Sequence, residues 1–78
     1  MTGRQVRAAR ALLGWPADKL AEASKVGIST IGRAEGMDGG VRMTPANAHA
    51  VQSALEAAGV EFIEQNGGGA GVRMKVPD

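Results

Sequence analysis

The sequence predicts a mainly α-helical fold, a bundle of about four helices followed by a short C-terminal β segment. Four stretches place apolar residues at helical spacing, and glycine, proline or threonine stands at their ends. One stretch near the C-terminus instead alternates apolar and charged residues, as a strand does. A chain of 78 residues has room for a single small domain, which is marginally stable unless a disulfide, a metal or a partner chain contributes.

The first two expected helices are short and follow each other closely. The first covers Arg4 to Leu13 and ends at Gly14, which adopts a left-handed backbone conformation without a Cβ penalty. Pro16 prevents any continuation of this helix, and the second helix covers Ala17 to Ser24. The apolar residues expected to face inward from these two helices are Val6, Ala9, Leu12, Leu13, Leu20 and Ala21.

Two further helices are expected after a break at Lys25 to Gly27. The third covers Ile28 to Glu35, ends at Gly36 and is followed by a glycine-containing loop. Thr44 followed by Pro45 begins the fourth, because threonine caps free amides and proline suits the first helical position. The fourth helix has an apolar face and a terminating glycine: Ala48, Val51, Ala54, Leu55, Ala58 and Gly59.

The remaining segment predicts two short strands. Val60 to Ile63 and Val72 to Val76 are the strands, and the glycine-rich Asn66 to Gly71 joins them. Because an isolated hairpin is barely stable in water, this one is expected either to pack on the fourth helix or to pair with the tail of a second copy.

Composition excludes several classes of function. The chain has no cysteine, so it has neither disulfides nor thiolate metal sites, and His49 lacks further ligands at the spacing that structural zinc requires. No nucleophile, base and orienting group can be assembled, so we expect a non-enzyme without cofactors. No apolar run reaches the roughly 18 residues that span a bilayer, and we expect a cytoplasmic protein.

The charge is unevenly distributed along the chain. Residues 1–44 carry seven basic and four acidic side chains, a net charge of +3, whereas residues 45–78 carry two basic and four acidic ones, a net charge of −2. The first part is therefore the candidate for binding a polyanion. Arg4 and Arg7 lie one helical turn apart in line with Arg10, and this row faces either phosphate or water.

Two short helices separated by a turn of three or four residues have the spacing of a helix-turn-helix unit. The stretch from Arg7 to Gly36, RAARALLGWPADKLAEASKVGISTIGRAEG, resembles the helix-turn-helix of the Xre, Cro and phage-repressor family of bacterial transcriptional regulators. The resemblance implies a lambda-repressor-like bundle in which residues 1–59 form the DNA-binding domain. The matching residues are Arg10, Leu13, Gly14, Trp15, Leu20, Ala21, Val26, Ser29, Thr30, Ile31, Arg33 and Glu35.

The resemblance also implies which side chains meet DNA. In this family the third helix lies in the major groove, so Ile28, Ser29 and Arg33 are the expected base contacts and Thr30 lies near a phosphate or a base. The glutamine that often contacts phosphate at the start of the second helix is replaced by Ala17. Backbone anchoring is therefore expected from backbone amides and from basic residues, with Lys19, Lys25 and Arg42 completing the DNA-binding set.

Two more features follow from the resemblance. Arg10 and Glu35 are expected to form a structural pair that joins the first helix to the end of the third. At Lys25 the family usually has glycine, and a left-handed conformation costs a non-glycine residue on the order of 1 kcal/mol, so we expect a turn reshaped around Gly27. Trp15 is expected to be a core anchor.

These expectations favour a sequence-specific DNA-binding regulator, a repressor or autoregulator acting as a homodimer on a palindromic operator in the nucleoid. Residues 60–78 are the expected dimerisation element, through Val60, Phe62, Ile63, Val72 and Met74. The alternative is a protein-binding module of the same fold, such as an antitoxin or antiactivator, with a regulatory protein as its partner. The acidic second half and the alanine at position 17 favour this alternative.

Overall fold

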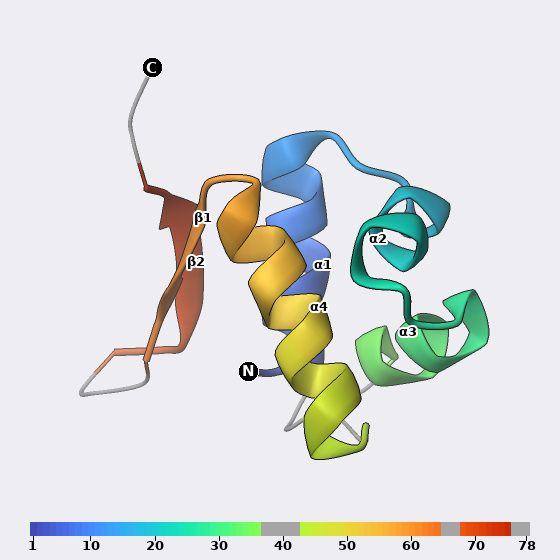
Figure 1. Cartoon of the computed structure of the whole chain (residues 1–78). Coiled ribbons are helices and arrows are strands. Elements are labelled where there is room, and N and C mark those ends of the chain that lie inside the picture. Colours follow the sequence, from blue (N-terminus) through green and yellow to red (C-terminus); the bar gives the residue numbers. More distant parts are fainter. Residues whose placement is uncertain (37–42, 65–67, 76–78) are drawn as a thin grey trace.

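The computed structural model describes residues 1–36, 43–64 and 68–75. This part of the chain is mainly helical, with one two-stranded antiparallel sheet (Figure 1). None of its helices combines the length and apolar character needed to cross a bilayer. The elements are α1 (Gly3–Leu13), α2 (Ala17–Ser24), α3 (Ile28–Glu35), α4 (Pro45–Ala57), β1 (Val60–Ile63) and β2 (Gly71–Met74).

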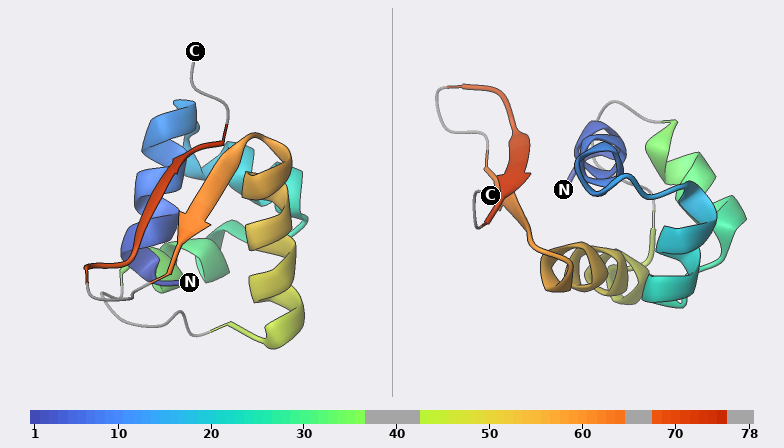
Figure 2. Two further views of the ribbon diagram at one scale, coloured as in Figure 1. Left: turned by 90° about the vertical axis from the view of Figure 1, so that its left-hand side faces the viewer. Right: turned by 90° about the horizontal axis from the view of Figure 1, so that it is seen from above.

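The elements form a closed ring around the core. On one side the hairpin bridges the two long helices, with β2 against α1 and β1 against α4. On the other side the short helices bridge the same pair, with α3 against α1 and α2 against α4. Figure 2 shows the hairpin and the α2–α3 pair on opposite sides of α1 and α4. Each element therefore covers a different part of one small core.

The core draws on all parts of this ring. Its fully enclosed side chains are aliphatic, and the partly buried Trp15 packs against them, as expected of a core anchor. Leu12, expected to widen the inward stripe of α1, is instead 46% exposed, so that prediction is wrong. The stripe is centred on Val6 and Ala9, and Leu12 lies on its outer flank. The core cluster consists of Val6, Ala9, Leu20, Val26, Ile31, Val51, Leu55 and Val60.

The helix ends follow local sequence signals. The hydroxyl of Thr44 accepts a hydrogen bond from the amide of Asn47, and Pro45 occupies the first turn of α4. Gly14 ends α1 in the left-handed conformation with φ +67°, as predicted. Gly59 follows α4 with φ +108° and turns the chain directly into β1.

The hairpin packs on its own chain, along both α1 and α4. Val60 pairs with Met74 and Phe62 pairs with Val72, so these four residues share the face that is turned toward the core. The other face carries Glu61 opposite Arg73, which form an exposed ion pair, and the partly buried Ile63. The hairpin therefore packs on α4, one of the two expected arrangements, and also on α1, which the sequence did not predict.

Candidate functional site

The two short helices α2 and α3 are held together by an apolar wedge beneath the turn that joins them. Leu20, Val26 and Ile31 form this wedge, and all three are buried. Ser24 fixes the turn from inside: its hydroxyl donates to the carbonyl oxygen of Leu20 at 2.7 Å and accepts from the amide of Val26 at 3.3 Å. The end of α2 and the start of α3 are therefore fixed by buried contacts.

The turn itself differs from the prediction. Lys25 adopts the left-handed conformation with φ +62°, whereas Gly27 has φ −59°, so the turn is not reshaped around Gly27. Val26 must enter the core immediately after α2 ends, and a left-handed residue at position 25 reverses the chain sharply enough to allow this. The Lys25 side chain remains exposed to solvent.

One face of α3 has no partner in the described part of the chain. Ile28, Ser29, Gly32 and Arg33 are exposed and follow one another at a spacing that places them on a single helical face. Thr30 is half-buried, and Ile31, Ala34 and Glu35 are buried on the opposite side. We call the four exposed residues the α3 face. It combines an apolar side chain, a hydroxyl, a bare backbone and a cation.

The α2 and α3 N-termini differ from those of the other two helices. Thr2 caps α1 and Thr44 caps α4 through side-chain hydrogen bonds. The residues in the corresponding positions of α2 and α3 are Pro16 and Gly27, and neither provides a side-chain acceptor. The first-turn amides of these two short helices are therefore donors for which a ligand oxygen is a suitable acceptor.

Arg10 and Glu35 join α1 to the end of α3, as the sequence prediction has it. Two hydrogen bonds connect the side chains, Nε to Oε2 at 2.6 Å and Nη2 to Oε1 at 2.8 Å, and Nη1 donates to the carbonyl oxygen of Trp15 at 2.9 Å. The side chains are 22% and 9% exposed. The hydrogen bond to Glu35 raises the pKa of Arg10, burial opposes this rise by a smaller amount, and the negative charge of Glu35 adds to it. Three segments of the chain thus meet at one guanidinium group.

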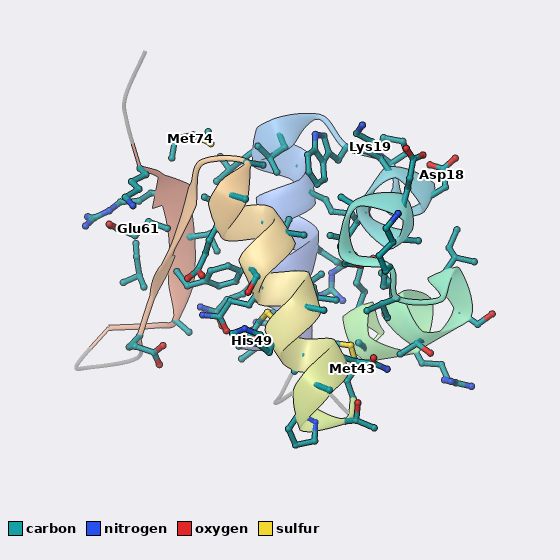
Figure 3. The ribbon with its side chains drawn as sticks, in the orientation of Figure 1. Asp18, Lys19, Met43, His49, Glu61 and Met74 are labelled. Atoms are coloured by element: carbon teal, nitrogen blue, oxygen red, sulfur yellow. The ribbon has the colours of Figure 1, made fainter. Side chains whose placement is uncertain are left out.

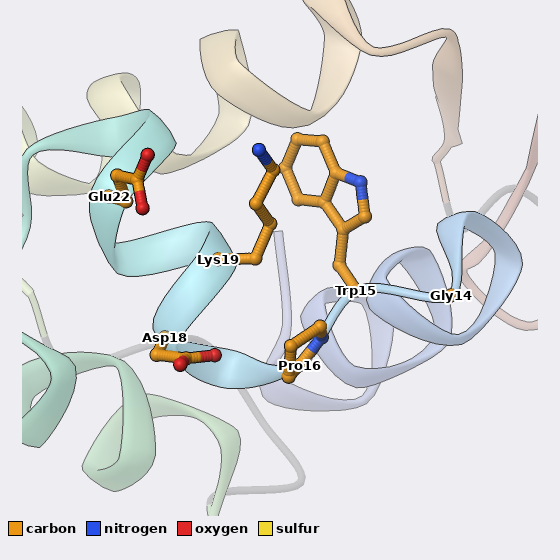
Figure 4. A pocket seen from close by; sticks show the side chains of 6 residues that line it. All are labelled: Gly14, Trp15, Pro16, Asp18, Lys19 and Glu22. Carbon is orange, nitrogen blue, oxygen red and sulfur yellow. The ribbon is translucent and has the colours of Figure 1, made fainter.

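Lys19 lies in a surface pocket between α1 and α2 rather than beside α3. Its Nζ atom is 5.8 Å from the centre of the Trp15 ring, and Figure 4 shows the lysine side chain directed toward that ring. The pocket has a volume of about 450 Å³. It is lined by Gly14, Trp15, Pro16, Asp18, Lys19 and Glu22.

The residues predicted for dimerisation lie on both faces of the hairpin. Val60 belongs to the core, and Phe62, Val72 and Met74 pack against it, whereas Ile63 lies on the outer face. Figure 3 shows Glu61, on the hairpin, and Asp18, on α2, at opposite sides of the molecule. Arg42, predicted to contact DNA, lies outside the described residues.

Sequence reasoning missed two polar residues that position these elements. Ser24 fixes the turn, and Gln5, which is only 4% exposed, bonds to both strands of the hairpin. The pattern Thr2-x-x-Gln5 is a capping-box signature that could have placed Gln5 at a helix start. Its contacts with the hairpin have no local sequence signal.

Comparison of the chain with known protein families finds no family that matches it, and comparison with curated proteins finds no matching sequence.

Proposed function

We propose that this chain is a sequence-specific DNA-binding transcriptional regulator of the helix-turn-helix type, with a lambda-repressor-like arrangement of helices. In this proposal α2 and α3 are the two helices of the unit, and α3 enters the major groove. The sequence resemblance to the Xre, Cro and phage-repressor family is one support. The geometry of α3 is the other.

The observation that carries the proposal is the α3 face. Ile31 and Ala34 attach one side of the helix to the core, while Ile28, Ser29 and Arg33 project from the other side and are exposed to solvent. Arginine can bond to guanine, serine to several base edges, and isoleucine to a thymine methyl group. An α-helix fits the major groove of B-DNA, so a projecting helix with these side chains matches that ligand.

Contacts with the DNA backbone are expected beside this face. The uncapped N-termini of α2 and α3 offer backbone amides to phosphate oxygens. Lys25 adds an exposed positive charge at the turn between them. Lys19 is less well placed for this role, because its ammonium group lies over Trp15.

A homodimer remains part of the proposal, since one recognition helix offers few base contacts and two multiply them. The hairpin residues that face the core serve their own chain, so a dimer through the hairpin would use its outer face or a strand edge. The distance between half-sites then reports the separation of the two α3 helices.

The test is selection of bound duplexes from a random DNA pool, followed by anisotropy titration of the enriched duplex at several salt concentrations. We expect an enriched inverted repeat. The binding constant should fall by about 0.9 logarithmic units per phosphate contact for each tenfold increase in salt concentration. Arg33→Ala should remove the preference for the base that Arg33 contacts and so weaken the overall sequence preference. The matched control is Lys75→Ala, which removes one exposed charge from the hairpin. No enrichment by the wild-type chain would overturn the proposal.

The pocket at Trp15 favours a second candidate function, a protein-binding module. The exposed carboxylates of Asp18 and Glu22, which line this pocket, suit a basic side chain of a partner protein. In that case Asp18→Lys would abolish partner binding, whereas Arg33→Ala would leave the function intact.

A further inference from the structure

Gly32 lies in the middle of α3, where no described neighbour requires a glycine. Its conformation is not left-handed, and a Cβ atom added there would meet no atom of the described residues within 4 Å. Glycine in a helix interior is less favourable than alanine, because it gives up more backbone freedom on folding. Neither packing among the described residues nor backbone geometry explains the residue. The missing side chain leaves room for a partner to approach the helix backbone closely.

The neighbours of Gly32 indicate what approaches. Ile28 lies one turn earlier on the same face and is 50% exposed, so half of a large aliphatic side chain is available to a ligand. Arg33 follows directly and is exposed, with no hydrogen bond or ion pair to another described residue. Along the helix there are thus, in this order, an aliphatic side chain that can contact a methyl group, a residue without a side chain, and a long side chain that donates hydrogen bonds.

We propose that the α3 face recognises a thymine and a guanine in each half-site, with the backbone at Gly32 in close contact with the groove between them. This inference rests on the proposed function and specifies the DNA sequence that it requires. Ile28 contacts the thymine methyl group, and Arg33 donates to N7 and O6 of the guanine. Ser29 adds a hydrogen bond but discriminates weakly, because a hydroxyl serves as donor or acceptor.

The spacing of the two bases follows from helix geometry. Residues 28 and 33 are separated by about 7.5 Å along the helix axis, at a rise of about 1.5 Å per residue. Base pairs are stacked about 3.4 Å apart. A helix that lies along the groove therefore places the thymine and the guanine about two base pairs apart.

Single-atom changes in the DNA test both contacts. In the duplex enriched by selection, each thymine is replaced in turn by uracil, which removes only the methyl group, and each guanine by 7-deazaguanine, which removes the N7 acceptor. We expect one uracil position to lower the affinity about four-fold. One 7-deazaguanine position about two base pairs away should lower it about five-fold or more.

Matching protein variants assign each base to its side chain. In Ile28→Ala the uracil substitution should have no further effect, while 7-deazaguanine keeps its full effect. In Arg33→Ala the pattern should reverse. The two variants serve as controls for each other, since both residues are exposed and neither substitution touches the core.

Gly32→Ala separates binding from folding. The added methyl group has open space in the free chain, so the midpoint of thermal unfolding should rise by about 2–8 °C. In the complex the same methyl group meets the groove, and the affinity should fall about five-fold or more. A variant that is more stable and yet binds DNA less well is the expected result.

The outcomes distinguish this inference from the proposed function. The inference is overturned if a selected duplex binds tightly and its affinity is unchanged by both base analogues, or is unchanged by Gly32→Ala. DNA binding itself would then still stand. If no duplex is enriched, the proposed function and the inference fail together.

Discussion

The side-chain amide of Gln5, in the first turn of α1, donates a hydrogen bond of 3.0 Å to the carbonyl oxygen of Gly71 at the start of β2. The same nitrogen donates to the carbonyl oxygen of Ile63 at 3.2 Å, and Oε1 accepts from the amide of Thr2 at 2.8 Å. One buried amide group therefore holds the loop end of the hairpin and the N-terminus of α1 together.

Replacement of this amide is predicted to destabilise the fold. Gln5→Ala leaves the two strand carbonyl groups without their donor, and each unsatisfied buried group costs about 1–3 kcal/mol. We expect a loss of about 2–3 kcal/mol, which lowers the midpoint of thermal unfolding by roughly 10–20 °C in a domain of this size. Gln52→Ala is the control, because among the described residues the Gln52 amide bonds to the exposed Glu56 and to no strand. Equal midpoints for the two variants would contradict the role given to Gln5.

Of the two ion pairs described here, Arg10–Glu35 is predicted to contribute more to stability than Glu61–Arg73. Glu35→Ala leaves a largely buried guanidinium group with only the Trp15 carbonyl oxygen, and we expect a cost of about 2–4 kcal/mol in urea unfolding. The comparison is Glu61→Ala, which breaks the exposed pair with Arg73 and should cost less than about 1 kcal/mol. Similar costs for the two variants would show that Arg10 is effectively solvated.

The alkaline pH dependence of this pair has a definite sign. Glu35 raises the pKa of Arg10, so the stabilisation is complete below the ordinary pKa of arginine and disappears only as the pH rises through a strongly alkaline range. The difference in unfolding free energy between the wild type and Glu35→Ala should therefore stay constant between about pH 7 and pH 9. A difference that shrinks over this interval would contradict the assignment.

The short helices could be predicted from the sequence, and the long-range polar contacts could not. The ranges of α2 and α3 coincide with the predicted ones, because Gly14, Pro16 and Gly36 act on adjacent residues. Gln5 bonds to residues 58 and 66 positions away, and helical periodicity carries no information about them. The turn at Lys25 is a third case. The sequence indicates that a left-handed lysine would be strained, but the prediction of a turn reshaped around Gly27 is wrong, because Lys25 itself is left-handed.

The hairpin is predicted to be essential for the fold itself. It closes the ring between α1 and α4 and brings Val60 into the core. Val60→Ala should cost roughly 1–3 kcal/mol without changing the oligomeric state, measured by urea unfolding and sedimentation. Removal of residues 60–78 should abolish cooperative unfolding. The free energy lost with the buried hairpin surface is comparable to the whole free energy of unfolding of a small domain. A truncated chain that unfolds cooperatively at the wild-type midpoint would refute this role.

Lys25 offers a prediction that joins stability to DNA binding. Its left-handed conformation costs an L-residue roughly 1–2 kcal/mol, whereas glycine adopts it freely but loses more entropy on folding. Lys25→Gly should therefore raise the unfolding free energy by about 0.5–1 kcal/mol. Lys25→Ala keeps the strained conformation and should give no such gain.

Both variants remove the same charge. If Lys25 contacts one phosphate, both should therefore make the slope of the logarithm of the DNA-binding constant against the logarithm of the salt concentration less steep by about 0.9. The two effects are separable because strain resides in the backbone and phosphate attraction in the side chain. Equal stability of the glycine and alanine variants would refute the strain argument, and an unchanged salt dependence in both would remove Lys25 from the proposed interface.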